Sequence, residues 1–171
     1  MQKSILNIED TKAVLISDYK PGAPEKYQGV LMAEISEIIG AVRLGYNMTI
    51  VPPGKVAFPA HNHYGNEEMF FITDGEGEVR IGNEKFAIRR GDVIACPAGG
   101  PETAHQIINS SATLTLRYLA VSTMQTPDFV QYPDSGKTGA AYYHDNTADG
   151  TRKAVRLLNR EQDNLGYWDG E

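Results

Sequence analysis

Two histidines of the chain, His61 and His63, stand two residues apart and are followed shortly afterwards by a pair of glutamates. In a β-strand, residues i and i+2 point to the same face, so both imidazoles can converge on one ion. Residues 64–66 have the composition of a turn, after which a second strand can bring Glu67 or Glu68 alongside. Neutral imidazole nitrogens and a carboxylate oxygen form a mixed ligand set that divalent transition metals favour. The spacing therefore predicts a metal site.

A third histidine, His105, lies far along the chain and is the candidate for a fourth ligand. An ion held by three imidazoles and one carboxylate would keep one or two coordination positions open to water or substrate. If His105 lay at the surface instead, the other two histidines and a glutamate could still form a facial triad of the type found in non-haem iron sites. Manganese, iron, nickel, zinc and copper all suit such ligands, so the identity of the metal stays open.

Short apolar or alternating runs separated by turn residues extend from about Gln28 to Ser122. This pattern is typical of antiparallel β-structure, and the Gly, Asn, Asp and Pro residues between the runs supply the backbone angles of sharp reversals. No helix pattern alternates with the runs, as a parallel sheet would require. The stretch therefore predicts an all-β barrel or sandwich. Its strands are expected at residues 28–36, 44–52, 67–73, 78–82, 84–89, 92–97, 105–108 and 113–122.

The sequence resembles the cupin superfamily in two motifs. The first motif, a Gly, a His-x-His pair, a Glu and a closing Gly, is matched by Gly54, His61, His63, Glu68 and Gly75, with one extra residue before His61. The second motif, a Gly, a Pro-x-Gly, a His and an Asn, is matched by Gly91, Pro97, Gly99, His105 and Asn109. The spacing to Gly75 favours Glu68 over Glu67 as the carboxylate ligand. One departure is the enlarged loop GPETA, which puts five residues between Gly99 and His105.

This resemblance implies a cupin double-stranded β-helix, a jelly-roll barrel, over about residues 28–122. It also implies one divalent metal ion held by His61, His63, Glu68 and His105. Cupins carry out dioxygenase, decarboxylase, isomerase and lyase chemistry, so the resemblance names a range of reactions. The segments PDFVQYPDSGK and YWDGE further resemble pieces that recur in a little-characterised group of single-domain cupins.

The two flanks of the predicted barrel differ from it in character, being poor in regular periodicity. Residues 1–27 are expected to form an N-terminal arm, and residues 123–171 a C-terminal extension that packs on the barrel. Within the extension, a stripe of apolar residues at 154, 155, 157 and 158 favours a short helix. The only tryptophan, Trp168, is expected to dock on the body, since a disordered tail would rarely carry one.

The composition limits which partners and which cellular compartment we expect. A formal charge of -6 offers no basic footprint for phosphates, so no nucleic acid is expected as a partner. No apolar run approaches the roughly 20 residues needed to cross a bilayer, and the N-terminus lacks the apolar core of a signal peptide. The only cysteine, Cys96, excludes an intrachain disulfide and is expected to be a buried thiol. These features favour the cytoplasm.

Two functions from different classes follow. The first is a metal-dependent enzyme acting on a small polar metabolite by isomerase, dioxygenase or decarboxylase chemistry. A sugar-phosphate isomerase would need basic residues in the pocket, for which Arg43, Lys55 and Arg117 are candidates, although a solvent-facing position is favoured for Arg117. The alternative is a non-catalytic cupin that binds or senses a small ligand, with the metal as anchor or structural element. A homodimer is expected, with the N-terminal arm as candidate for exchange.

Overall fold

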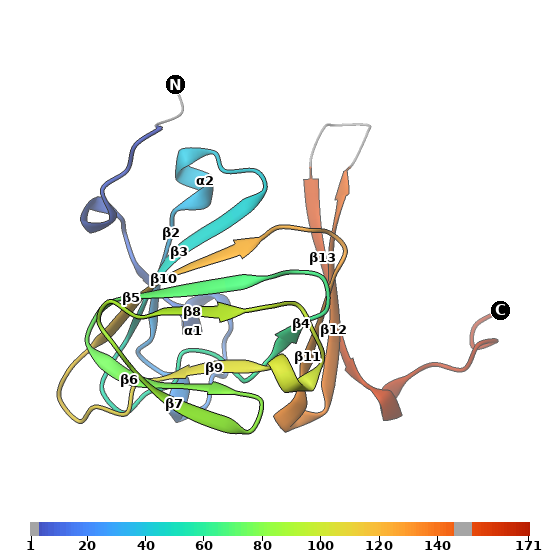
Figure 1. Cartoon of the computed structure of the whole chain (residues 1–171). Coiled ribbons are helices and arrows are strands. Elements are labelled where there is room, and N and C mark those ends of the chain that lie inside the picture. The colour runs from blue at the N-terminus through green and yellow to red at the C-terminus, as the bar shows by residue number, and fades with distance from the viewer. Residues whose placement is uncertain (1–3, 146–151) are drawn as a thin grey trace.

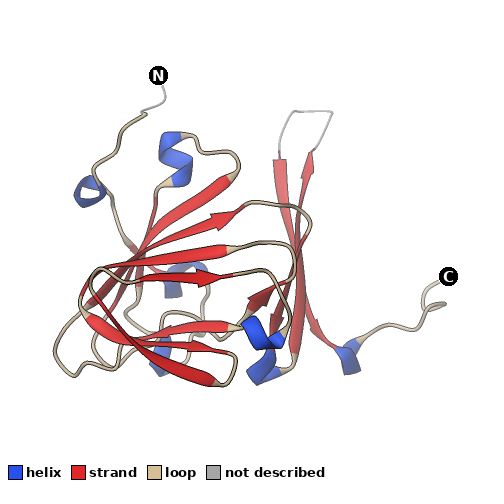
Figure 2. Ribbon diagram, viewed as in Figure 1, coloured by secondary structure: helices blue, strands red, loops and turns tan. Residues whose placement is uncertain are grey.

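The runs of alternating and apolar residues form antiparallel strands, as Figures 1 and 2 show for the computed structural model, which describes residues 4–145 and 152–171. All the strands predicted between residues 28 and 122 are present, and the all-β jelly-roll fold class is confirmed. They are β2 (Leu31–Glu34), β3 (Leu44–Val51), β5 (Glu68–Asp74), β6 (Glu76–Ile81), β7 (Glu84–Arg89), β8 (Val93–Cys96), β9 (His105–Ile108) and β10 (Leu116–Thr123).

Two sheets enclose the main core. One has the strand order β1-β2-β3-β10-β5-β8 and the other the order β7-β6-β9. Strand β10 alternates as a strand with one buried face should, with Leu116, Tyr118 and Ala120 buried. These residues pack with Ile72 of β5 and Val79 of β6, so the core lies between the two sheets.

The turn between β5 and β6 depends on Gly75, which closes the first motif. Its φ of 80° lies in the left-handed region, and a Cβ at this position would collide with the backbone carbonyl of Thr115. Only glycine meets both conditions without strain.

The N-terminal arm packs on the barrel of its own chain. It contains the 3-10 helix η1 (Ile8–Asp10), the strand β1 (Val14–Leu15), the helix α1 (Ile16–Tyr19) and the 3-10 helix η2 (Glu25–Tyr27). Strand β1 pairs with β2, and Leu6 and Ile8 pack against a second small core that includes Met48 of β3. A further helix, α2 (Ser36–Ile39), precedes β3. In the described part of the chain, no helix is long and apolar enough to span a bilayer.

The C-terminal extension is a β-structure, so the predicted helix is wrong. It comprises β11 (Asp128–Tyr132), η4 (Pro133–Ser135), β12 (Lys137–Asp145), β13 (Arg152–Arg160) and η5 (Glu161–Asp163). The apolar stripe at 154–158 lies in β13, which pairs along its whole length with β12, and this pairing overrides a weak helical pattern. The docking predicted for Trp168 is also wrong: the side chain is 77% exposed, and the tail leads away from the barrel in Figure 1.

The extension also reaches the predicted metal segment. Strand β4 (Asn62–His63) is hydrogen-bonded to β11, and the four-stranded sheet has the order β13-β12-β11-β4. In this sheet His63 is the partner of Val130. The division into arm, barrel and extension at residues 27 and 122 stays a prediction, but the extension shares a sheet with the segment that carries the histidines.

Candidate metal centre

The backbone brings the first and last of the predicted ligands into direct contact. His61 and His105 form an isolated antiparallel bridge, in which the His105 N–H donates to the His61 carbonyl at 2.8 Å and the reverse bond is 3.2 Å long. His63 follows on β4, and β5 begins with Glu68. The enlarged GPETA loop does not displace His105, because the 3-10 helix η3 (Pro101–Thr103) takes up its extra residues and β9 starts at His105.

Three imidazole nitrogens converge on one carboxylate. Glu68 Oε2 lies 2.8 Å from His105 Nε2, 3.7 Å from His63 Nε2 and 3.8 Å from His61 Nε2. One ligand atom from each of His61, Glu68 and His105 lies within 4.8 Å of the others, which is close enough for a shared ion. Glu67, the competing carboxylate, is exposed. The structure thus brings together the four residues predicted from the sequence.

The outer nitrogen of each imidazole faces a hydrogen-bond acceptor. His61 Nδ1 is 2.8 Å from the Pro59 carbonyl, His63 Nδ1 is 2.7 Å from Asp128 Oδ2, and His105 Nδ1 is 3.3 Å from the Thr103 carbonyl. A carbonyl or carboxylate can only accept, so the Nδ1 atoms of His61 and His63 carry a proton and donate it. In a neutral ring at either position the Nε2 lone pair is then free and directed at the centre. His105 Nε2 lies 2.8 Å from Glu68 Oε2 and is hydrogen-bonded to that carboxylate, a contact that a bound metal ion would replace.

An unpartnered nitrogen tests whether the site suits a metal. His63 Nε2 is buried, and within the described ranges 4–145 and 152–171 it has no hydrogen-bond partner. A buried polar atom without a partner is costly, and a metal ion among the four ligands would satisfy it. The donor set of imidazoles and carboxylate is that of a divalent transition-metal site, so the residues fit the group that the resemblance implies.

The electrostatics of the site match this assignment at His61 and Glu68. Burial lowers the pKa of His61 to about 4, with His105 adding to the effect and Glu68 opposing it. Burial acts to lower the pKa of His63, but the hydrogen bond to Asp128 and the charge of Glu68 outweigh it and raise that pKa. Burial acts to raise the pKa of Glu68, yet the His105 hydrogen bond and the nearby histidines bring it below its usual value. Near neutral pH, Glu68 is ionised and His61 is neutral, as metal ligands must be.

Asp128 is the site residue that sequence reasoning missed. It begins β11, lies far from His63 in the chain and accepts the His63 Nδ1 proton through Oδ2. Carboxylates of this kind fix the orientation and tautomer of metal-binding imidazoles. The only signal was its position in PDFVQYPDSGK, a segment noted for its resemblance and not for chemistry.

An open cavity of about 710 Å³ adjoins three of the four side chains. His61, His63 and Glu68 lie in its wall together with Phe70 and Tyr118. The alternating apolar residues of β3 and β5 also supply the cores: Ile72 lies in the main core, whereas Met48 lies in the second core with Tyr46 and Ile50 packed against it. The Tyr132 ring stacks on His61 with centroids 5.9 Å apart, adding a phenol to the wall.

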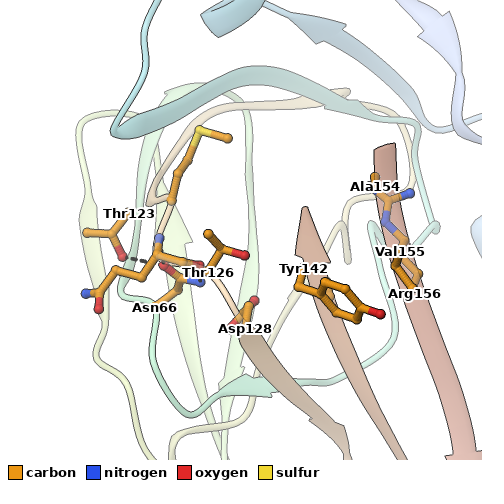
Figure 3. A pocket seen from close by; sticks show the side chains of 11 residues that line it. Asn66, Thr123, Thr126, Asp128, Tyr142, Ala154, Val155 and Arg156 are labelled. Carbon is orange, nitrogen blue, oxygen red and sulfur yellow. Dashed lines mark hydrogen bonds between the residues drawn. The ribbon is translucent and has the colours of Figure 1, made fainter. Parts of the chain in front are cut away.

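A second, smaller cavity of about 150 Å³ has Asp128 in its wall and lies between the end of β10 and the paired strands β12 and β13. Figure 3 shows Asp128 facing this space, with Tyr142 and Arg156 across from it. Asp128 therefore binds a predicted ligand, His63, and also lines the smaller cavity.

The basic residues predicted for the pocket lie elsewhere. Arg117 alternates with the cavity-lining Tyr118 on β10, points away from the cavity and binds Glu9 at 3.0 Å. Lys55 donates to the backbone carbonyl of Glu25 at 3.0 Å, and neither it nor Arg43 lines the cavity. These residues are therefore wrong as candidates for substrate binding.

Comparisons with known proteins agree with the fold. Residues 47–122 match the cupin domain family. A sugar phosphate isomerase of the cupin superfamily from Silicibacter pomeroyi superposes with a TM-score of 0.74 over 96% of this chain and 98% of that chain, at 20% identity. A predicted oxalate decarboxylase from Thermotoga maritima superposes with a TM-score of 0.57 over 71% of this chain and 99% of its own, at 25% identity.

Sequence relatives match part of the chain. An uncharacterised protein from Methanocaldococcus jannaschii is 42% identical over 60 residues, which are 35% of this chain and 45% of that protein. Cupincin from Oryza sativa is 30% identical over 95 residues, 53% of this chain and 19% of its own. The matched segments thus span less than half the length of these relatives. Residues 47–122 thus match the cupin domain family, and the jelly-roll barrel and the two motifs agree with this match.

Proposed function

We propose that this protein is a metal-dependent enzyme that acts on a small polar metabolite inside the barrel. His61, His63, Glu68 and His105 would hold one divalent ion. The observation that carries the proposal is that the Nε2 atoms of His61, His63 and His105 lie within 3.8 Å of one Glu68 carboxylate oxygen, while every Nδ1 faces an acceptor of its own. An ion bound there would act as a Lewis acid on a hydroxyl or carbonyl, lower the pKa of a bound water or activate dioxygen.

Residues around the site also have roles in this proposal. Phe70 and Tyr118 form an apolar wall that limits water at the centre. The Tyr132 hydroxyl is a candidate to exchange a proton with substrate, since its ring stacks on His61 and lines the cavity. Burial and the charge of Asp128 raise the pKa of Tyr132, which favours its protonated form as a general acid.

For the reaction we propose a set of classes and not a single one. Isomerase, decarboxylase and dioxygenase chemistry are the classes to test, and the names of two proteins of similar fold, a sugar phosphate isomerase and a predicted oxalate decarboxylase, make the first two a reasonable start. Manganese, iron, nickel, zinc and copper are the metals to test for each.

A metal titration followed by a substrate screen tests the proposal. The metal-stripped chain is loaded with each of the five ions and assayed with sugar phosphates and small carboxylic acids. Turnover that rises with metal occupancy and saturates at about one ion per chain supports the enzyme. Tight binding of a small molecule without turnover, at full occupancy, contradicts it and indicates the alternative, a binding or sensing cupin.

We further propose that the protein forms a homodimer. Strand β13 lies at the edge of its sheet, with Leu157 and Leu158 more than half exposed. An exposed edge strand is commonly covered by another chain. The N-terminal arm pairs within its own chain through β1, so the extension replaces it as the candidate for contact with a second copy.

A further inference from the structure

Three lysines line the same cavity as the predicted metal ligands, although none was singled out from the sequence. Lys20 follows α1, Lys26 lies in η2 and Lys137 begins β12. They come from the N-terminal arm and the C-terminal extension, the two segments outside the barrel. Both flanks thus place positive charge at the mouth of the cavity, on a chain whose net charge is -6.

The carboxylates nearby already have cations of their own. Asp134, also in the cavity wall, forms a bidentate pair with Arg80 at 2.8 and 2.9 Å. Glu25 lies 3.8 Å from Lys55, and Asp128 is bound to His63. Across residues 4–145 and 152–171, none of the three cavity lysines forms a salt bridge with a carboxylate.

The uncompensated charges also repel one another. Partial burial, followed by the charges of Arg156 and Lys137, lowers the pKa of Lys20. Like charges held together in a partly desolvated wall are unfavourable unless an anion binds between them. The arrangement is what an anion-binding site needs, since an incoming anion would relieve the repulsion and gain charge-assisted hydrogen bonds.

One of these lysines, Lys137, lies near the predicted metal centre. Lys137 Nζ lies 5.2 Å from the centroid of the Tyr132 ring, and the same ring stacks on His61 with an angle of 26° between the planes. One aromatic ring therefore contacts both an ammonium group and a predicted ligand. A molecule of a few carbon atoms could reach both.

We infer that the cavity binds a small anion, a phosphate monoester or a carboxylate, whose charged group lies between Lys20 and Lys137. Lys26 adds to the field at the rim. The argument for an anion subsite depends only on the lysines. The placement of the other end of the bound molecule at the metal centre rests on the proposed function. An anionic substrate was also considered from the sequence, but with Arg43, Lys55 and Arg117 as the residues that would bind it.

Calorimetric titration of inorganic phosphate and of acetate into the full chain, as purified and after chelator treatment, tests the subsite. The variant Lys20→Ala/Lys137→Ala is expected to bind the preferred anion at least about 10-fold more weakly, because two charge-assisted hydrogen bonds are lost. The variant Lys20→Arg/Lys137→Arg keeps both charges and should retain most of the affinity. A preference for phosphate or for acetate identifies the charged group of the natural molecule.

The matched control removes two lysines outside the cavity, Lys12→Ala/Lys85→Ala, and should leave the affinity unchanged. Circular dichroism checks that each variant is folded. Saturable binding that the Lys20→Ala/Lys137→Ala variant retains, or the absence of saturable binding of either anion to the wild type, would overturn the inference. Anion binding by the chelator-treated wild type does not depend on metal, so failure of the metal site and failure of the subsite give different results.

Discussion

An imidazole offers one lone pair to a metal, and the partner of its other nitrogen decides which one. In this chain all three partners are acceptors, two backbone carbonyls and the carboxylate of Asp128. The carbonyls of Pro59 and Thr103 come from residues two positions before the histidines they orient, so local backbone geometry provides them. Asp128 comes from a distant strand and is the one partner that mutation can remove.

Asp128→Asn is expected to weaken metal binding by about 10- to 100-fold, because a neutral amide replaces the charged acceptor that fixes the His63 ring and raises its basicity. Competition with a chromogenic chelator measures the affinity. Asp134→Asn is the control, since Asp134 lines the same cavity but is bound to Arg80. Equal affinities for wild type and Asp128→Asn would remove Asp128 from the site.

Cys96 provides a prediction that depends on pH. Burial, with the charge of Glu68 adding to it, raises the pKa of the thiol to about 12 from its usual value of 9.0. The folded state binds this proton more tightly, so the contribution to stability is present below pH 9 and is lost as pH rises toward 12. Between pH 8 and 9 the folded chain should react with a disulfide reagent far more slowly than the denatured chain. Equal rates would show that the thiolate is accessible.

At the scale of elements, the strands of the barrel follow from local sequence. Alternation in β10 and the turn residues at each end specify where the strand lies and which face is buried. The extension does not follow in this way: the residues from Ala154 to Leu158 have a helical stripe, yet they pair with β12, and pairing partners cannot be read from the pattern of a single segment. The apolar stripe does not mark a buried face either, since Leu157 and Leu158 are largely exposed.

Gly75→Ala is expected to destabilise the fold by roughly 1–3 kcal/mol or more, because alanine would adopt a left-handed φ and its Cβ would meet the Thr115 carbonyl. Thermal or urea unfolding measures the loss. Gly54→Ala is the matched control: its φ of 69° is also left-handed, but no atom lies within 4 Å of the new Cβ. If both variants lose the same stability, the close approach to Thr115 has no energetic role.

At the scale of the whole molecule, the residues of the site come either from the barrel or from the two flanking segments. The four predicted ligands lie in two motifs with recognisable spacing, and they could be named from the sequence. Asp128, Lys20 and Lys137 reach the site only because the arm and the extension fold back over the mouth of the barrel. Nothing in the local sequence of these segments encodes that contact, so only the three-dimensional structure reveals it.

The exposed edge of β13 leads to a prediction about assembly. Light scattering coupled to size-exclusion chromatography should give about twice the chain mass of 18.8 kDa. Leu157→Lys/Leu158→Lys, which places charge on the edge strand, should shift the equilibrium toward monomer. Phe86→Lys, which changes another exposed apolar residue, on β7, is the control. A wild-type monomer at micromolar concentration would contradict the proposed dimer.

The most direct test of the proposed centre is the metal content of purified protein, compared between wild type and His61→Ala/His63→Ala by inductively coupled plasma mass spectrometry at neutral pH. Wild type should carry up to about one divalent transition-metal ion per chain, and the double variant, shown to be folded by circular dichroism, should carry almost none. Stoichiometric metal in the folded double variant would mean that these histidines do not hold the ion.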